Sequence, residues 1–538
     1  MRLTRRVRHT GVALVAASAL VLSACGGGGS DKDTFRIAYN GDGGHKEWAD
    51  ATANQIKNVL GIDASGQSYA TFDDLRTDVT ERTIETSFRT GWQPDYPSIY
   101  NYLGPLYGTD AGSNDGDYSD EEFDDLLEQV SAAQDDTTAF ALQDQAQEIL
   151  LEDLPAIPLW YSNNSGAAST NVENVEFTWQ NMPDFGAITK PAGGPILAYG
   201  GQPQNPLIPT ATNENLGGRI IDELWEGLVR YENDGTAVNA VAESITSEDN
   251  LTWTVKIKPG LTFSNGEPIN AESFVTPWNY GAVGANSQLN SYFFYPIKGF
   301  DEAQADEADS LSGLTVVDDQ TFTIELNQPE ASFPDRLGYS AFYPVPASAW
   351  DDLEAFGRNP VGNGQYKLAS ADAWQDDVEI ALVPNENYQG EVPAANAGLT
   401  FKFYADSADP AYTDLQAGNL DVMEQVPASA LSTFETDDKV QAFNSPGSVF
   451  QSFTIPQDAP HFEGEEGRLR RQAISMAINR EEICDKIFNG TRTPATEFSS
   501  PVMPGYNGTI AGNEVLQYNP EKAKELWEEA NAISEWKN

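Results

Sequence analysis

The chain has 538 residues, and its 82 Asp and Glu against 31 Lys and Arg give a formal net charge of −51. This charge argues against nucleic acid as a partner and against docking on anionic lipid through a basic patch. A hydrophobic content of 40%, with 11% aromatic residues, supplies a core and argues against disorder in spite of the charge. The length suggests two to four domains of ordinary size, so we expect a soluble, acidic, well-packed protein.

The first residues have the pattern of a secretory signal. Four arginines precede an apolar stretch over residues 11–22, which is too short to span a bilayer comfortably. The Leu-Ser-Ala-Cys that ends at Cys25 resembles a bacterial lipobox. That resemblance implies cleavage before Cys25 and a diacylglyceryl group on its sulfur, and two or more acyl chains anchor a protein stably. The alternative is an ordinary signal peptide that ends there by chance. We expect a signal peptide over residues 1–24, then a lipid anchor and linker over residues 25–33.

Candidate catalytic groups are scarce. Beyond the signal the only histidines are His45 and His461, and neither has metal-type spacing with a cysteine or another histidine. The chain has no phosphate-binding loop, no nucleophile elbow and no zinc-protease motif. Cys484 lies in an apolar helical pattern, which favours a buried, inert thiol over a nucleophile. We therefore predict no enzyme activity, no cofactor and no metal site.

The acidic stretch over residues 110–125 raises calcium as an alternative. It lacks acidic groups at the offsets that an EF-hand loop requires around Gly116, so calcium is the lesser interpretation. The run from Ser119 to Glu122 has the pattern of a capping box at the start of a helix that ends at Val130. We expect the remaining acids on a solvated face.

Strand-like and helix-like segments alternate along the chain, which indicates the α/β class. The sequence predicts strands over residues 34–40, 84–92, 157–161, 196–200, 251–257, 320–326, 378–382 and 399–404. Apolar residues at helical spacing predict helices over residues 47–60, 119–130, 137–151, 218–228, 469–478 and 520–532. Residues 191–195 (PAGGP) have the composition of a linker.

Short motifs are spread over the chain beyond the anchor. They are LWEGL at 224–228, AES at 242–244, LTWTVKI at 251–257, FSNGEP at 263–268, NGQY at 363–366, LQAGNLDVM at 415–423, RQAI at 471–474, AINR at 477–480 and NPEKAKEL at 519–526. Each is weak alone. Together they resemble bacterial solute-binding proteins of family 5, the periplasmic or lipid-anchored receptors of peptide and nickel ABC importers. The resemblance implies the two-lobed periplasmic-binding-protein fold of class II, in the peptide-receptor type with an extra subdomain and the ligand enclosed between the lobes.

The order of the segments departs from the family. There, the helix that resembles residues 519–526 is followed by a strand that resembles residues 34–40, whereas here that strand follows the anchor. Residues 194–207 resemble the family's mature N-terminus, and residues 148–190 its C-terminal part. The sequence therefore predicts a circular permutation, with the family's ends joined near Lys190 and new ends in a helix–strand loop, where permutation is usually tolerated. It requires residues 34–60 and 519–538 to be neighbours.

On this map lobe 2 takes residues 34–168 and 405–538, and lobe 1 takes residues 169–404 with the inserted subdomain. The resemblance implies a monomeric receptor, held by its lipid at the outer face of the cell membrane. It would capture short peptides and deliver them to the permease subunits of an ABC importer. The alternatives are another solute in the same fold, such as an oligosaccharide or a metal chelate, and a secreted lipid-anchored hydrolase.

The segment FRTGWQPDY, which contains Asp95, resembles a strand-to-loop segment of the peptide receptors. Burying a peptide requires a carboxylate for its ammonium, a cation for its carboxylate and strand-like backbone for its amides. By resemblance, Asp95 receives the ammonium. Gly91, Trp92 and Gln93 offer backbone pairing, with the Trp92 indole as a pocket wall. Arg89 matches a position that meets the ligand carboxylate, but on a regular strand it points away from the Trp92 side, and a structural ion pair is its alternative.

Other candidate residues come from separate segments. Asn213, Glu214 and Asn215 match a lobe 1 loop whose backbone pairs with peptides in the family; a cap for the following helix is the alternative, and both can hold. Phe450 lies on a strand expected near the pocket, with core packing as its alternative. Tyr96 either lines the pocket or packs. The scarcity of histidine disfavours nickel bound by imidazoles, and the carboxylate in the peptide-like segment favours an amine over a sugar.

Overall fold

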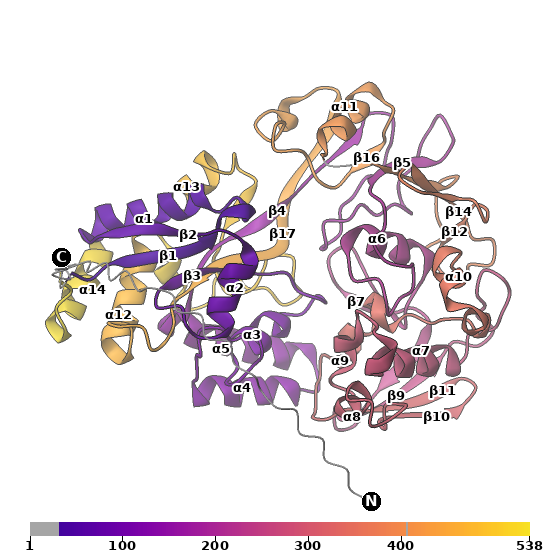
Figure 1. The fold of residues 1–538 in the computed structure, drawn as a ribbon, viewed down its shortest axis with the longest axis horizontal. Coiled ribbons are helices and arrows are strands. Elements are labelled where there is room, and N and C mark those ends of the chain that lie inside the picture. Colours follow the sequence, from indigo (N-terminus) through magenta and orange to yellow (C-terminus); the bar gives the residue numbers. More distant parts are fainter. Residues whose placement is uncertain (1–31, 405–406, 538) are drawn as a thin grey trace, which may run out of the picture.

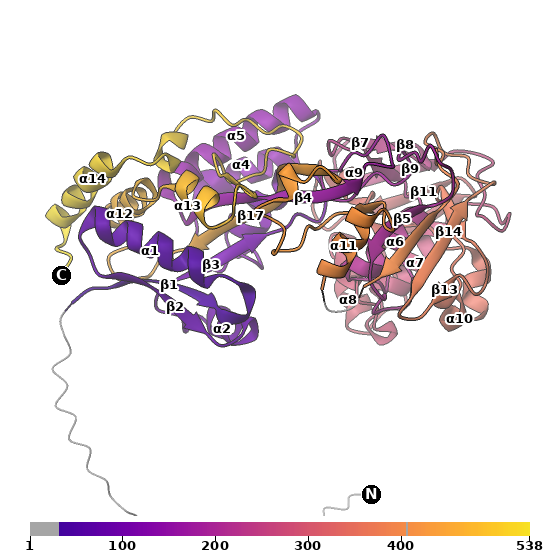
Figure 2. The same ribbon diagram turned by 90° about the horizontal axis from the view of Figure 1, so that it is seen from above.

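The computed structural model describes residues 32–404 and 407–537. The chain forms two lobes joined by two long strands, β4 (Ala156–Ser169) and β17 (Val440–Thr454), which pair antiparallel and run between the lobes (Figures 1 and 2). The predicted signal peptide and Cys25 lie outside the described residues. Within the described ranges, every helix is too short or too polar to cross a membrane.

Lobe 2 contains both ends of the described chain (Figure 1). Its sheet continues from β17 through β3 (Ser87–Trp92) and β1 (Phe35–Asn40) to β2 (Ala64–Tyr69), and β1 is parallel to both of its neighbours. A short strand, β18 (Arg492–Pro494), pairs with β4. The lobe 2 helices are α1 (Lys46–Leu60), α2 (Phe72–Thr80), α3 (Tyr100–Tyr107), α4 (Glu121–Ser131), α5 (Asp136–Asp153), α12 (Gly464–Met476), α13 (Arg480–Lys486) and α14 (Pro520–Ile533).

Lobe 1 holds the other half of the large sheet, in the order β12-β14-β15-β5-β16-β4. The strands are β5 (Ile196–Gly200), β12 (Tyr366–Leu368), β14 (Glu379–Pro384), β15 (Leu399–Phe403) and β16 (Val422–Met423), and β13 (Trp374–Gln375) pairs with β14. The helices are α6 (Asn215–Leu224), α9 (Phe333–Arg336), α10 (Leu353–Arg358) and α11 (Asp409–Ala417).

A second sheet in lobe 1 has its own hydrophobic core. It is antiparallel in the order β10-β11-β9-β8. Strands β6 and β7, which precede β8 in the sequence, form a separate two-stranded sheet. These elements are β6 (Val229–Tyr231), β7 (Ala237–Asn239), β8 (Ala242–Thr246), β9 (Thr252–Ile257), β10 (Leu314–Asp318) and β11 (Thr321–Glu325), with helices α7 (Glu272–Ala282) and α8 (Phe300–Gln304).

Lobe 1 continues past residue 405. In one cluster, Tyr412 and Leu415 of α11 pack with Met423, and Leu197 of β5 packs against that cluster. β16 pairs with β5, so this stretch extends the lobe 1 sheet. The lobe boundary expected at residue 405 therefore lies within β17.

The two ends of the described chain touch each other. The Asp33 amide donates to the Lys537 carbonyl at 2.8 Å, and the Lys537 amide donates to the Asp33 carboxylate at 2.7 Å. Helix α1 also packs on α14. The segments that a permutation requires to be neighbours are neighbours.

Most predicted elements are present with shifted ends. The strand expected over residues 196–200 coincides with β5. The helix expected from Ser119 begins at Glu121, because the Asp120 carboxylate accepts from the Phe123 amide and takes the cap. The helix expected over residues 218–228 is α6, which ends at Leu224 because Trp225 has extended backbone.

Candidate ligand-binding site

A cavity of about 870 Å³ lies between the two lobes. Lobe 2 contributes Gln93, Asp95 and Arg492, and lobe 1 contributes α6 with the loop before it. Residues 162–165 of β4 and Ser448 of β17 also line it, so the strands that join the lobes form part of its wall. A cavity of this size between two bodies is a default position for a small ligand.

Asp95 enters this cavity from the loop after β3. Its amide donates to the Asn101 side-chain oxygen at 3.1 Å, and the Trp92 indole donates to the same oxygen at 3.1 Å. Asn101 is 2% exposed on α3, so it fixes the loop against a rigid helix. Burial raises the pKa of Asp95, and the neighbouring Arg336 is already paired with Glu330. No cation of the described chain forms an ion pair with the Asp95 carboxylate, which a cationic ligand group would therefore stabilise.

The strand that leads to Asp95 has a free edge. Residues 88–92 of β3 pair with β17, but only Ser87 and Phe88 pair with β1. In the described sheet, Gly91 and Trp92 therefore have one edge without a strand partner. Such an edge accepts an extended ligand by backbone hydrogen bonds.

The loop before α6 brings Asn213, Glu214 and Asn215 to the same cavity. The Glu214 carboxylate accepts from the Gly217 amide at 2.9 Å and from the Gln204 amide at 3.1 Å. Glu214 is thus the helix cap, as the alternative interpretation held, while all three residues line the cavity.

Five predicted site residues do not line the cavity between the lobes: Arg89, Gly91, Trp92, Tyr96 and Phe450. Arg89 and Phe450 line a separate cavity of about 200 Å³ within lobe 2, which Gly91 and Trp92 also border. The Arg89 Nε donates to the Asn40 side chain at 2.9 Å. Phe450 is fully buried and meets Tyr102 edge-on. Tyr96 is also fully buried, with the lobe 1 Arg336 guanidinium 4.7 Å above its ring, so it lies in a contact between the lobes.

Arg492 is a cavity residue that the sequence did not single out. One of its Nη atoms donates to the Thr491 carbonyl at 2.6 Å, and the guanidinium lies 4.9 Å from the Phe488 ring centre. It forms no ion pair with a carboxylate among residues 32–404 and 407–537. Nothing in its local sequence marks it, because only the pairing of β18 with β4 brings it to the cavity.

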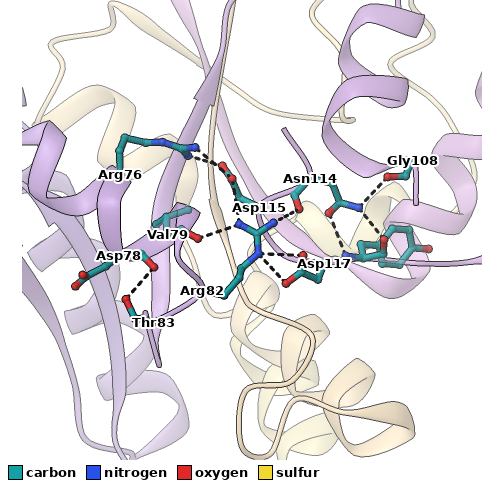
Figure 3. A network of polar contacts seen from close by, with 10 residues as sticks. Arg76, Asp78, Val79, Arg82, Thr83, Gly108, Asn114, Asp115 and Asp117 are labelled. Atoms are coloured by element: carbon teal, nitrogen blue, oxygen red, sulfur yellow. Dashed lines mark hydrogen bonds and ion pairs between the residues drawn. The ribbon is translucent and has the colours of Figure 1, made fainter. Parts of the chain in front are cut away.

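The acidic stretch is held by arginines (Figure 3). Asp115 pairs with Arg76 at 2.5 Å and with Arg82 at 3.6 Å, and Asp117 pairs with Arg82 at 2.9 Å. Asn114 closes the loop by donating to the Gly108 carbonyl at 2.9 Å. These contacts fasten the loop before α4 to α2. Where the chain is described, no three His, Cys, Asp or Glu side chains are grouped so as to hold a metal ion.

Cys484 is buried, as predicted. Burial raises the pKa of its thiol to about 12, which keeps the thiol protonated and unreactive.

Residues 236–537 match the family described as bacterial extracellular solute-binding proteins, family 5 Middle. The chain belongs to this family. Among curated family 5 relatives, the oligopeptide-binding protein OppA of Bacillus subtilis is 26% identical over 57% of this chain and 56% of its own. The dipeptide-binding protein DppE of the same organism is 26% identical over 58% of each chain. The glutathione-binding protein GsiB of Pectobacterium atrosepticum is 26% identical over 60% of this chain and 59% of its own. The matched part of this family 5 chain thus spans somewhat more than half the length of these relatives.

Solved structures support the family 5 fold. The unliganded open form of the periplasmic murein tripeptide binding protein MppA superposes with a TM-score of 0.55, at 22% identity over 63% of this chain and 65% of that one. HbpA2 from Haemophilus parasuis superposes with a TM-score of 0.51, at 21% identity over 63% of this chain and 66% of that one. At these identities the likeness shows the fold, and it confirms the predicted two-lobed α/β architecture. The family is one of solute-binding proteins rather than enzymes.

Proposed function

We propose that the protein is an extracytoplasmic receptor that encloses a short peptide between its lobes and delivers it to the permease of an ABC importer. One observation carries the proposal. The cavity between the lobes offers a carboxylate without a cation and a guanidinium without an anion, and its lining residue Gln93 directly follows β3, a strand with a free edge. An extended zwitterionic peptide that leaves water needs an anion for its ammonium, a cation for its carboxylate and hydrogen-bond partners for its backbone. The names of the relatives, which bind oligopeptides, dipeptides and glutathione, support the proposal.

Each group has a role in this proposal. Asp95 receives the peptide ammonium, and the backbone of the β3–Asp95 segment pairs with the peptide where it enters the cavity at Gln93. Arg492 takes the carboxylate role first assigned to Arg89, because Arg492 lines the cavity between the lobes whereas Arg89 borders the smaller one. Asn213 and its neighbours contact the ligand from lobe 1.

Closure of the lobes is the proposed mechanism. A ligand that contacts both lobes favours the closed state, which then docks on the permease. The bend occurs in β4 and β17, whose pairing register shifts between Pro446 and Phe450. No bond of the ligand changes.

The anchor and the chain order are part of the same proposal. A lipid on Cys25 would tether lobe 2, since the described chain begins there, and leave lobe 1 free to close. The family's ends are joined near Lys190, where Gly193 and Gly194 have φ values of 78° and 90° and form a turn into β5. The contact between Asp33 and Lys537 supports new ends in lobe 2.

Isothermal titration calorimetry with trialanine tests the receptor function. We expect micromolar or tighter binding, strongly weakened in Asp95→Ala. Native mass spectrometry of the purified protein identifies any ligand that co-purifies. Hydrolysis of the peptide during titration, or the absence of binding to any peptide of two to five residues, would overturn the proposal. Binding of maltotriose in place of peptides would favour the oligosaccharide alternative.

A further inference from the structure

The cavity carries more negative charge than the roles above use. We propose that its lobe 1 wall is a subsite for the cationic end of a basic side chain, so that the preferred ligands are peptides containing lysine, arginine or ornithine. This inference rests on the proposed peptide receptor function and specifies its substrate class.

The charges that line the cavity are unequal. Eight carboxylates but only three guanidinium groups line it. Arg219 is paired with Glu424 at 2.5 Å, and Arg230 with Glu232 at 2.7 Å. Among the described residues, six cavity carboxylates then remain without an ion-pair partner, and Arg492 is the one cavity arginine that is also unpaired. Charges held in an enclosed space are costly without counter-charges, so the missing cations are best supplied by the ligand.

Three of these carboxylates lie together at the end of α6. Asp222 accepts from the Tyr343 hydroxyl at 3.3 Å, Glu223 from the Gln365 amide at 3.2 Å and Glu226 from the Tyr388 hydroxyl at 3.0 Å. These donors are neutral, so they orient the carboxylates without compensating their charge; Arg230 and Lys258 lie near Glu226 alone and lower its pKa, against the larger effect of burial. Each carboxylate keeps lone pairs for a further donor. The negative end of the helix dipole adds to the attraction for a cation.

Two buried polar atoms beside this cluster have no partner. Trp225 lines the cavity and is 2% exposed, yet its indole nitrogen makes no hydrogen bond within the described residues. The Gln365 side-chain oxygen is likewise buried without a donor. Buried polar atoms nearly always have partners. Trp225 lines the cavity, so a ligand carbonyl that reaches its indole nitrogen would give this group a partner.

The enclosed position of the cluster also affects its acidity. Asp222 is exposed to the cavity, and desolvation by the protein atoms around its carboxyl group raises the pKa to about 7. Burial likewise raises the pKa of Glu223. A bound cation reverses such shifts, because it favours the ionised carboxylate.

The cluster and the proposed ammonium site line the same cavity. Tyr339 lines the cavity, and its pKa is raised by burial first and then by the negative charges of neighbours that include Asp95 and Asp222. Both carboxylates therefore lie near one tyrosine. A short peptide with a free ammonium and a basic side chain matches this pair.

Calorimetry with matched peptides tests the inference on the full protein. The probes are trialanine with one residue replaced by lysine, at each of the three positions in turn, and the same three peptides with norleucine, which lacks the ammonium. We expect at least one lysine peptide to bind about tenfold or more tightly than its norleucine partner, the ratio that one charge-assisted hydrogen bond supports. Asp222→Asn should bring that ratio close to one and leave the norleucine affinity unchanged.

Two further variants control for charge and folding. Glu302→Gln removes one negative charge from the exposed surface of α8 and should leave the ratio unchanged. Glu226→Gln should lower the ratio as Asp222→Asn does, and retained norleucine binding shows that each variant is folded. Peptides that bind with no lysine preference at any position overturn the subsite but leave the receptor function standing. Binding of spermidine without any peptide overturns both.

Discussion

Replacing Asp95 by asparagine keeps the shape of the side chain but removes the charge proposed to receive the peptide ammonium. The structure sets the size of the effect. The carboxylate is largely buried, and Arg336, the cation that lowers its pKa, is already bound to Glu330. The ammonium would therefore be its principal counter-charge. A hydrogen bond to a charged group contributes about 1.5–3 kcal/mol, so we expect about 2 kcal/mol, or about 30-fold in Kd.

The assay is a thermodynamic double-mutant cycle, in which one change is made in the protein and the other in the ligand, measured by isothermal titration calorimetry. Trialanine and N-acetyl trialanine, which has no ammonium, are each titrated into the native protein and into Asp95→Asn. Acetylation should weaken binding to the native protein by about 30-fold but change little in the variant, a coupling of about 2 kcal/mol. Asp73→Asn, an exposed change on α2, serves as the matched control. If acetylation weakens both proteins equally, the ammonium does not meet Asp95 and the assignment is refuted.

Four other predictions follow from the structure. Arg492→Met should weaken trialanine binding about tenfold or more and leave binding of its C-terminal amide unchanged, whereas Arg89→Met should affect neither; the reverse pattern in calorimetry would restore Arg89 to the carboxylate role. Because the pKa of Asp222 is about 7, affinity for the preferred lysine peptide should fall as the pH is lowered from about 8 to about 6, with no matching fall for norleucine. Asp115→Asn removes a partly buried pair with Arg76 and should lower the free energy of unfolding by about 1 kcal/mol in urea titrations without altering peptide affinity, and an unchanged midpoint would show that the loop is held by its other contacts. A gene rearranged into family order should yield a protein with the same peptide affinities, and a loss of folding would argue against the permutation.

Local sequence predicted the compact elements better than the long ones. The strand over residues 196–200 coincides with β5, and the helix over residues 520–532 is α14, because apolar spacing and an N-terminal proline are local signals. β4 was expected to end at residue 161 but continues to Ser169 through a polar run with low strand propensity. Its second half is a strand because residues 163–169 pair with β17, and no local pattern encodes that pairing.

The site shows the same division. Asp95, Gln93 and the loop at Asn213 were expected at the ligand through resemblance, and the structure brings them to one cavity. Arg492 and the cluster at Asp222 were not expected. Their proposed roles rest on the absence of ion-pair partners around them. Whether a side chain has such a partner depends on the folded arrangement and is not encoded in any short stretch of sequence.

The two strands that join the lobes also limit how the lobes can move. β4 and β17 are hydrogen-bonded side by side, so they act as a two-stranded ribbon, which is stiff within its own plane and bends across it. In the proposed closure, this pairing would restrict the lobes to bending about one axis. The same ribbon lines the cavity through Asn164 and Ser448, so a ligand in the cavity would contact β4 and β17, the strands proposed to bend. Ligand length should therefore set the final angle between the lobes, and peptides of graded length should give a graded series of closed states rather than one.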